Sequence, residues 1–468
     1  MTFIENIREI SGKIGEKISE VFDGTKLNDL AKKVGFVQRS TSRIEGEDFV
    51  QLMTTEILGE ETVSTEGLCD ILRQINPKAD MTPQSLNERI NKKEAAGYMR
   101  EVFESAFRKN LEPVRSEISP DMLLPFGRVF LEDSTQVRLH EKLADDFKGS
   151  GGSAGISALK IDLIYEVKQD ILQKILISGG STNDQSRADE ILAEIQENDL
   201  VLRDLGYFTL KSLIGIGGKS AFFLSRLLKS VNVYFSDDKD ASPVNLPKYL
   251  DKKYGRLSVT ELTVYLGEER LPCRLVAYRL PDEVVRERRG KARSTAQKKG
   301  GQRSKDYLNW LRFGFFVTNV PSEIWEPEVV GTVYRLRWQI ELTFKNWKSL
   351  LNIHVLRGTR RERIECFLYG RLTAVVVMTM ISGFASWYAC GYLKKEASFH
   401  KLTDWLKRKD RLAKAIRSGS SDELFEELIR DISGKLCKQK RKRKTSRQML
   451  EGEGIPYMES FPSYGSEK

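Results

Sequence analysis

The pattern of apolar and polar residues changes its period near residue 119, which divides the chain into differently built parts. Before that point apolar residues recur at helical spacing, and capping residues precede several segments. Ser64 opens the segment 64–75, and Thr82 followed by Pro83 opens another. We therefore expect residues 1–118 to form a separate helical domain. The two short helices on either side of 76–80 form either a helix-turn-helix or an ordinary helical hairpin, and the pattern favours neither.

Short apolar segments with a strand period follow from residue 127 onward. The predicted strands are 127–133, 159–167, 170–178, 200–204, 221–228, 313–320 and a pair within 260–280 that turns at 267–269. We expect the first three to be antiparallel, with a loop rich in Gly and Ser at 149–157. Residues 183–198 and a segment beginning at Thr209 predict helices. The pattern therefore predicts an α/β class.

Helices are predicted again in the last third of the chain. One begins at Pro327 and carries a single apolar stripe as far as Leu351. The next contains 372–393, which has no charged residue and is long enough to span a bilayer. Its Gly, Ser and Thr residues favour a buried helix packed on a sheet, with a membrane anchor as the alternative. Residues 400–436 predict charged helices, and we expect the basic run 435–447 to be unfolded without a partner.

The composition is that of a globular protein with polyanionic partners. Hydrophobic residues make up 40% and charged residues 30% of the 468 residues, and 76 Lys and Arg exceed 66 Asp and Glu by 10. Five scattered cysteines without a C-x-x-C pair indicate neither a disulfide framework nor a zinc finger, and favour a reducing compartment. Three scattered histidines leave carboxylates to bind any metal. Charged residues interrupt the N-terminal segment early, which argues against a signal peptide.

Positive charge is concentrated in residues 286–305, where Glu287 is the only carboxylate before Lys305. We expect this stretch to be a basic loop. This loop is either an ordinary solvated loop or an arm that binds phosphates, and the excess of cations favours the phosphate-binding arm. Its candidate DNA contacts are Arg288, Arg289, Lys298 and Lys299.

Four polar residues on the helix that follows Pro327 carry the most specific signal. At about 100° per residue, Tyr334, Arg337, Glu341 and Lys348 project from one narrow face beside the apolar stripe. The alternative is a solvated face with ordinary i, i+4 pairing between Arg337 and Glu341. A phenol, two cations and one acid in this alignment favour a site that grips a phosphodiester beside a metal-binding carboxylate.

The spacing Y-x2-R-x3-E-x6-K of these residues resembles the signature of a subgroup of DDE transposases from bacterial and archaeal insertion sequences. The resemblance covers residues 119–395 and implies a ribonuclease-H-like core in which two aspartates and a glutamate hold two Mg²⁺ ions, for which Mn²⁺ can substitute. It places the catalytic and metal-binding roles on Asp133, Asp204 and Glu341, in the settings VFLEDST and LVLRDLGYF. Spacing alone does not exclude other carboxylates: Glu132, Asp162, Glu166, Asp184 and Asp189.

The same resemblance implies roles for DNA-binding residues. Arg337 and Lys348 would hold the phosphate near the scissile bond, and Tyr334 would donate to a phosphate oxygen. Family members can cleave through a DNA hairpin with a flipped base stacked on an aromatic residue. Trp310 is the candidate for that stacking, with a packed core tryptophan as the alternative. Arg226 is a further candidate phosphate contact.

Together these expectations describe an α/β transposase with a ribonuclease-H-like core, interrupted by a mainly β insertion and flanked by helical regions. The expected parts are a DNA-binding domain at 1–118, the core at 119–229 and 321–395, the insertion with the basic loop at 230–320, and a helical region with a basic tail at 396–468. The protein would cleave the ends of its mobile element by Mg²⁺-dependent hydrolysis and join their 3′-hydroxyls to target DNA. Its expected partners are double-stranded transposon-end and target DNA and a second copy of the chain, in the cytoplasm at the nucleoid and not at a membrane. A catalytically silent DNA-binding derivative is the alternative.

Overall fold

The computed structural model describes residues 3–39, 41–54, 64–114, 120–152, 155–255, 257–418, 421–439 and 450. Within it the chain divides into two units. Unit 1 comprises Met1–Ile118, Ser134–Thr182 and Glu341–Lys440, and unit 2 comprises Ser119–Asp133, Asn183–Ile340 and Arg441–Lys468. The division into five domains stays a prediction.

Unit 1 begins with the predicted helices. They are α1 (Phe3–Val21), α2 (Gly24–Lys33), α3 (Gly46–Thr54), α4 (Thr65–Ile75), α5 (Pro83–Ile90) and α6 (Lys93–Leu111). The predicted caps are confirmed, since Ser64 Oγ accepts a hydrogen bond from the Gly67 amide at 3.0 Å and Thr82 Oγ1 accepts one from the Ser85 amide at 3.2 Å. These caps set the starts of α4 and α5, because each satisfies an amide that has no partner within its helix.

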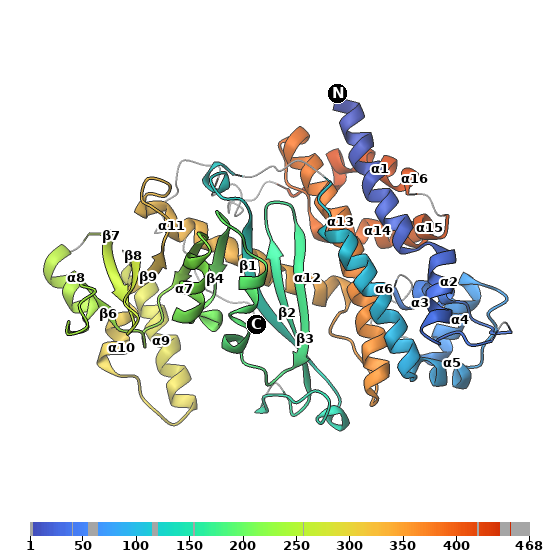
Figure 1. Ribbon diagram of the computed structural model, residues 1–468, viewed down its shortest axis with the longest axis horizontal. Helices are drawn as coiled ribbons and strands as arrows, with labels where there is room; N and C mark the ends of the chain where they lie inside the picture. The colour runs from blue at the N-terminus through green and yellow to red at the C-terminus, as the bar shows by residue number, and fades with distance from the viewer. Residues whose placement is uncertain are drawn as a thin grey trace. The chain divides into compact units, whose positions relative to one another are not determined.

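The uncharged segment 372–393 lies in α13 (Arg361–Leu393), which packs against α6 and α3 of the same unit (Figure 1). The most apolar 18-residue window of α13 is 94% buried, so the predicted core helix is confirmed. Gly370 is required where α13 approaches α3, because a Cβ atom there would stand 2.1 Å from the Met53 carbonyl oxygen.

Shorter helices follow α13 in unit 1, as predicted for 400–436. They are α14 (Phe399–Lys407), α15 (Arg411–Ser418) and α16 (Asp422–Asp431). The expected basic run 435–447 lies outside the described residues from 440 onward.

The sheet has the strand order β3-β2-β1-β4-β5-β9-β8-β7-β6. The strands are β1 (Val129–Arg138), β2 (Ala158–Glu166), β3 (Ile171–Gly179), β4 (Leu200–Arg203), β5 (Phe222–Arg226), β6 (Val233–Tyr234), β7 (Val259–Leu266), β8 (Leu271–Arg279) and β9 (Phe313–Thr318). Strand β1 pairs in parallel with β4, and β4 with β5, whereas β2 with β3 and the series β5-β9-β8-β7-β6 are antiparallel. The mixed α/β class and the predicted antiparallel pair within 260–280 are confirmed.

Unit 2 contains most of the strands and five helices wholly within it among its described residues. These are α7 (Leu210–Gly218), α8 (Leu246–Tyr254), α9 (Asp282–Lys298), α10 (Lys305–Trp310) and α11 (Pro327–Tyr334). The 3₁₀ turn Arg335–Arg337 and helix α12 (Trp338–Leu351) follow, and α12 passes into unit 1 at Glu341. The single long helix predicted after Pro327 is therefore interrupted beside Arg337.

Three further sequence predictions are wrong in detail. The basic stretch is not a loop: most of it forms α9, because acidic residues open the helix and Val285 and Ala296 provide a buried face. Residues 183–198 form two short 3₁₀ turns instead of a helix, because the first turn buries no residue and so lacks the packed face that stabilises a helix. The first strand does not end at Asp133, since β1 continues to Arg138.

Candidate active site

The site is built on two neighbouring parallel strands with similar sequences. The first five residues of β1 are VFLED, and the four residues of β4 together with the residue that follows them are LVLRD. The pairing register aligns them, with Val129 opposite Leu200 and Glu132 opposite Arg203. Asp133 and Asp204 therefore follow at equivalent positions, and Asp133 lies at the level where β4 ends.

A buried ion pair fixes this register. Arg203 Nη2 lies 2.9 Å from Glu132 Oε2, and the two side chains are 0% and 3% exposed. The guanidinium also donates to the Tyr207 carbonyl at 3.0 Å and to the Ala188 carbonyl. Burial lowers the pKa of Arg203, and the negative charge of Glu132 opposes that effect. Glu132 is thus a structural partner of Arg203, and this pair was not singled out from the sequence.

The pair has a signal in the sequence. Opposite charges stand at the same position of two otherwise apolar segments, directly before each predicted aspartate. Successive side chains of a strand point to opposite faces. A one-residue slip between β1 and β4 would therefore bring a buried charge opposite an apolar side chain.

The two aspartates share one cationic neighbour. Arg337 Nη1 lies 3.6 Å from Asp133 Oδ2, and Arg337 Nε lies 3.6 Å from Asp204 Oδ1. The Asp133, Asp204 and Arg337 side chains are 23%, 38% and 15% exposed. The backbone also orients Asp204, whose Oδ2 accepts from the Gly206 amide at 3.5 Å. Three residues predicted to belong to one site thus come together within unit 2.

Several of the competing carboxylates have structural partners elsewhere. Asp162 Oδ1 lies 3.5 Å from Lys160 Nζ in the buried strand β2. Glu166 accepts from the amides of Lys168 and Gln169 at 3.0 and 2.8 Å, which stabilises the turn after β2. Asp189 pairs with Lys211 at 2.6 Å on the surface, and Asp184 lies in one of the 3₁₀ turns. These contacts give Asp162, Glu166 and Asp189 structural roles, whereas Asp184 lies beside Gly206 in the turn that follows Asp204 and stays a competing carboxylate.

The other residues of the signature lie on α11 and α12. Tyr334 is 8% exposed, and its ring packs edge-on against Phe316 with centroids 5.1 Å apart. In unit 1, Lys348 Nζ donates to the Gln136 carbonyl at 3.1 Å, and burial lowers the pKa of Lys348. Glu341 is half-buried in α12. In the described part of the chain, no group of three or more His, Cys, Asp and Glu side chains is arranged to hold a metal, so Glu341 as third ligand stays a prediction.

The candidate DNA contacts of unit 2 differ in exposure. Arg288 donates to the Phe313 carbonyl at 3.4 Å and Arg289 to the Leu308 carbonyl at 2.9 Å, so both attach α9 to its neighbours. Lys298 and Lys299 are exposed at the end of α9, and Arg226 is exposed at the end of β5. The Trp310 ring packs against Phe315, with centroids 4.3 Å apart.

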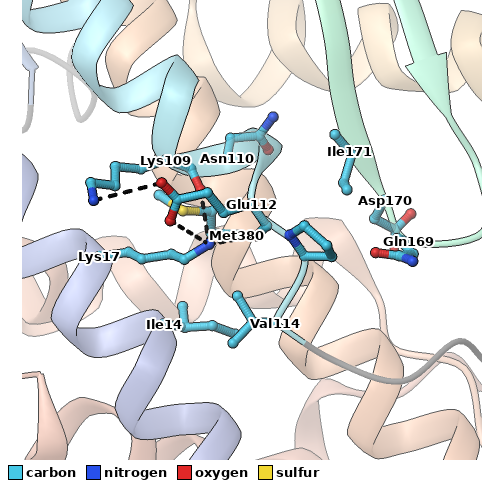
Figure 2. Close-up of a pocket in the computed structure, with 11 residues that line it drawn as sticks. Ile14, Lys17, Lys109, Asn110, Glu112, Val114, Gln169, Asp170, Ile171 and Met380 are labelled. Carbon is cyan, nitrogen blue, oxygen red and sulfur yellow. Dashed lines mark hydrogen bonds and ion pairs between the residues drawn. The ribbon is translucent and has the colours of Figure 1, made fainter.

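A small cavity in unit 1 contains none of the predicted site residues (Figure 2). Lys17 extends across it, and its Nζ donates to the carbonyls of Lys109 and Glu112 at the end of α6. The volume of about 20 Å³ gives room for about one water molecule. The cavity is therefore too small for a substrate.

Comparison with known proteins identifies the family of the chain. The family described as "Transposase DDE domain" matches residues 124–377. The transposase for insertion sequence element IS231B of Bacillus thuringiensis subsp. berliner is 31% identical over 370 residues, which cover 75% of this chain and 76% of the relative. The transposase for element IS1151 of Clostridium perfringens is 29% identical over 391 residues, covering 79% and 80%.

A solved piggyBac transposase synaptic complex with hairpin DNA is similar with a TM-score of 0.46 and 10% identity, over 92% of this chain and 87% of that one. The family match extends over the segments that carry Asp133, Asp204 and the Tyr-Arg-Glu-Lys residues. The chain belongs to the family of DDE transposases encoded by insertion sequences.

Proposed function

We propose that this transposase cleaves DNA at the ends of its own mobile element by metal-dependent hydrolysis and joins the resulting 3′-hydroxyls to target DNA. The observation that carries the proposal is the convergence of Asp133 and Asp204 on one cationic group, from adjacent parallel strands. The buried Glu132–Arg203 pair beside them supports a geometry that is fixed before substrate binds.

The donor set fits a divalent cation. Carboxylate oxygens are the ligands that Mg²⁺ and Mn²⁺ take in phosphoryl-transfer sites. A single guanidinium already lies 3.6 Å from both carboxylates, so one cation is able to interact with both. Asp133 and Asp204 would hold the ions, with Glu341 as the third ligand. Ions so bound stabilise the attacking and leaving oxygens of an in-line displacement.

The remaining signature residues would act on the DNA backbone. Arg337 and Lys348 would bind phosphate oxygens beside the scissile bond, and Tyr334 would donate a hydrogen bond there. Burial lowers the pKa of Lys348 and so disfavours its charged form. The negative charge of a nearby phosphate would oppose this effect and stabilise the ammonium group. Trp310 is retained as the residue that would stack a flipped base on a hairpin route.

DNA binding outside the site would use the basic surface of unit 2. Helix α9 presents exposed Arg286 and Arg293 on one face and exposed Lys298 and Lys299 at its end. Such cations bind phosphates without reading sequence. The N-terminal helices would recognise the element ends. Cleavage at two ends would use a homodimer, in the cytoplasm at the nucleoid of a bacterial or archaeal cell.

A nicking assay tests the catalytic proposal. Purified protein should convert a supercoiled plasmid carrying both element ends to nicked or linear products in the presence of Mg²⁺ or Mn²⁺, and not with EDTA. Asp133→Asn, Asp204→Asn and Glu341→Gln should each abolish the products, while Asp189→Asn, which removes a surface carboxylate paired with Lys211, should not. Wild-type protein that binds the ends without cutting them would instead establish the catalytically silent alternative.

A further inference from the structure

Arg337 is held between the two aspartates by its place in the fold. It ends the 3₁₀ turn that separates α11 from α12, and its side chain is 15% exposed. Two different nitrogens of the guanidinium face the two carboxylates, Nη1 toward Asp133 and Nε toward Asp204, each at 3.6 Å. The planar, fork-like guanidinium suits this bridging contact better than an ammonium group.

Electrostatics explains why a cation is needed there. The parallel pairing of β1 and β4 brings Asp133 and Asp204 to neighbouring positions, where two ionised carboxylates repel each other. A guanidinium does not lose its proton in proteins, so Arg337 supplies a permanent positive charge. Its single charge offsets one of the two negative charges, so the repulsion within the pair is reduced without any bound ion.

We propose that Arg337 is an internal counter-cation that a divalent metal ion must displace from Asp133 and Asp204. The inference rests on the proposed function, because it takes these aspartates as the metal ligands. Metal and guanidinium compete for the same carboxylate oxygens, so occupancy by one opposes the other. Displacement ends the contacts of Arg337 with these two carboxylates, and a DNA phosphate can then bind the guanidinium in their place.

Two consequences follow from this competition. Removal of the guanidinium increases the affinity of the two aspartates for the metal ion. Metal and DNA also strengthen each other's binding, because a phosphate that holds Arg337 frees the aspartates for the ion. An arginine that served only to orient the metal ligands would have the opposite effect on metal affinity, so the two roles differ in sign.

The test measures Mn²⁺ binding to the full-length protein without DNA, by isothermal titration calorimetry and by electron paramagnetic resonance of free Mn²⁺. Arg337→Gln should bind Mn²⁺ about fivefold or more tightly than the parent, within the usual range of coupling between two sites. Arg335→Gln is the matched control, because it removes the same charge from the same 3₁₀ turn, and its affinity should stay within about twofold of the parent. Arg337→Lys should give an intermediate affinity.

Thermal unfolding provides a second readout. In EDTA, Arg337→Gln should unfold at a lower temperature than the parent, because its aspartates repel each other. Added Mn²⁺ should raise its unfolding temperature by more than it raises that of the parent.

The outcomes separate this inference from the function on which it rests. Unchanged or weaker Mn²⁺ binding in Arg337→Gln, with binding abolished in Asp133→Asn and Asp204→Asn, would overturn the counter-cation role alone. Mn²⁺ binding that persists at the parent's affinity in both aspartate variants would overturn the metal site itself. Tighter binding in Arg337→Gln and loss of binding in the aspartate variants is the result we expect.

Discussion

Neutralising Glu132 should destabilise the protein strongly, although the substitution barely changes the shape of the side chain. Glu132→Gln leaves the Arg203 guanidinium, which is 0% exposed, without the carboxylate that lies 2.9 Å from it. The carbonyls of Tyr207 and Ala188 still accept from Arg203, but neither carries a full negative charge. The variant therefore contains a buried cation that has lost its nearest carboxylate.

The magnitude follows from the burial of this pair. At an effective dielectric constant of about 20, two unit charges about 4 Å apart interact by about 4 kcal/mol. Removing one partner of a buried pair costs about 3–5 kcal/mol in the free energy of unfolding. Arg203→Met should cost about as much, because it leaves Glu132 buried. The double variant Glu132→Gln/Arg203→Met should lose less than the sum of the two single losses, with a coupling energy of about 2–3 kcal/mol.

Urea unfolding followed by tryptophan fluorescence measures these free energies. Glu287→Gln is the control, because it breaks an exposed ion pair with Lys291 in the same unit and should change the free energy of unfolding by less than about 1 kcal/mol. A loss below about 1 kcal/mol in Glu132→Gln, equal to that of the control, would refute the reasoning. If the losses of unfolding free energy in the two single variants add up to the loss in the double variant, the direct pairing is refuted.

Three more predictions concern packing, ionisation and the basic helix. Gly370→Ala should destabilise the protein by about 1–3 kcal/mol, because the new methyl group would clash with the Met53 carbonyl. Gly97→Ala in α6 has open space around it and should stabilise the protein by about 0.5–1 kcal/mol. Urea unfolding measures both changes. Burial raises the pKa of Cys273 from 9.0 to about 12, so between these pH values only the thiol of the unfolded chain ionises. The contribution of this thiol to the free energy of unfolding should therefore fall by about 1.4 kcal/mol per pH unit in this range. In Cys273→Ala, unfolding measured as a function of pH should show a shallower fall of that free energy. In α9, Arg286→Gln should weaken binding to a DNA duplex and reduce the salt dependence of that binding, without loss of stability. Arg289→Gln should instead lower the free energy of unfolding by about 1–3 kcal/mol, because the Leu308 carbonyl loses its donor. Equal effects of the two arginine variants on duplex affinity and stability would contradict that distinction.

Much of the secondary structure could be predicted because the deciding interactions are local. The caps at Ser64 and Thr82 involve amides three residues away, and the consecutive apolar residues 200–202 predict β4, which ends at Arg203. The 183–198 region was predicted wrongly because its first turn buries no residue, and α9 because its short buried face is obscured by charge.

The site divides in the same way between local and distant causes. The resemblance selected Asp133, Asp204 and Arg337 by their local settings, and the structure brings these three together. It did not select the Glu132–Arg203 pair, whose partners stand far apart in the chain and meet only through the register of β1 and β4. The ligand role of Glu341 stays a prediction.

By itself the sequence determined most of the helical and extended segments, and which side chains can carry metal and phosphate chemistry. Periodicity, capping and residue type act over a few positions, so they are legible along a single chain. Only the tertiary structure decided that the Glu132–Arg203 pair fixes the strand register, that Arg288 and Arg289 serve packing, and that Arg337 bridges the two aspartates. Each of these depends on the distance between groups far apart in sequence, and the pairing of strands sets that distance.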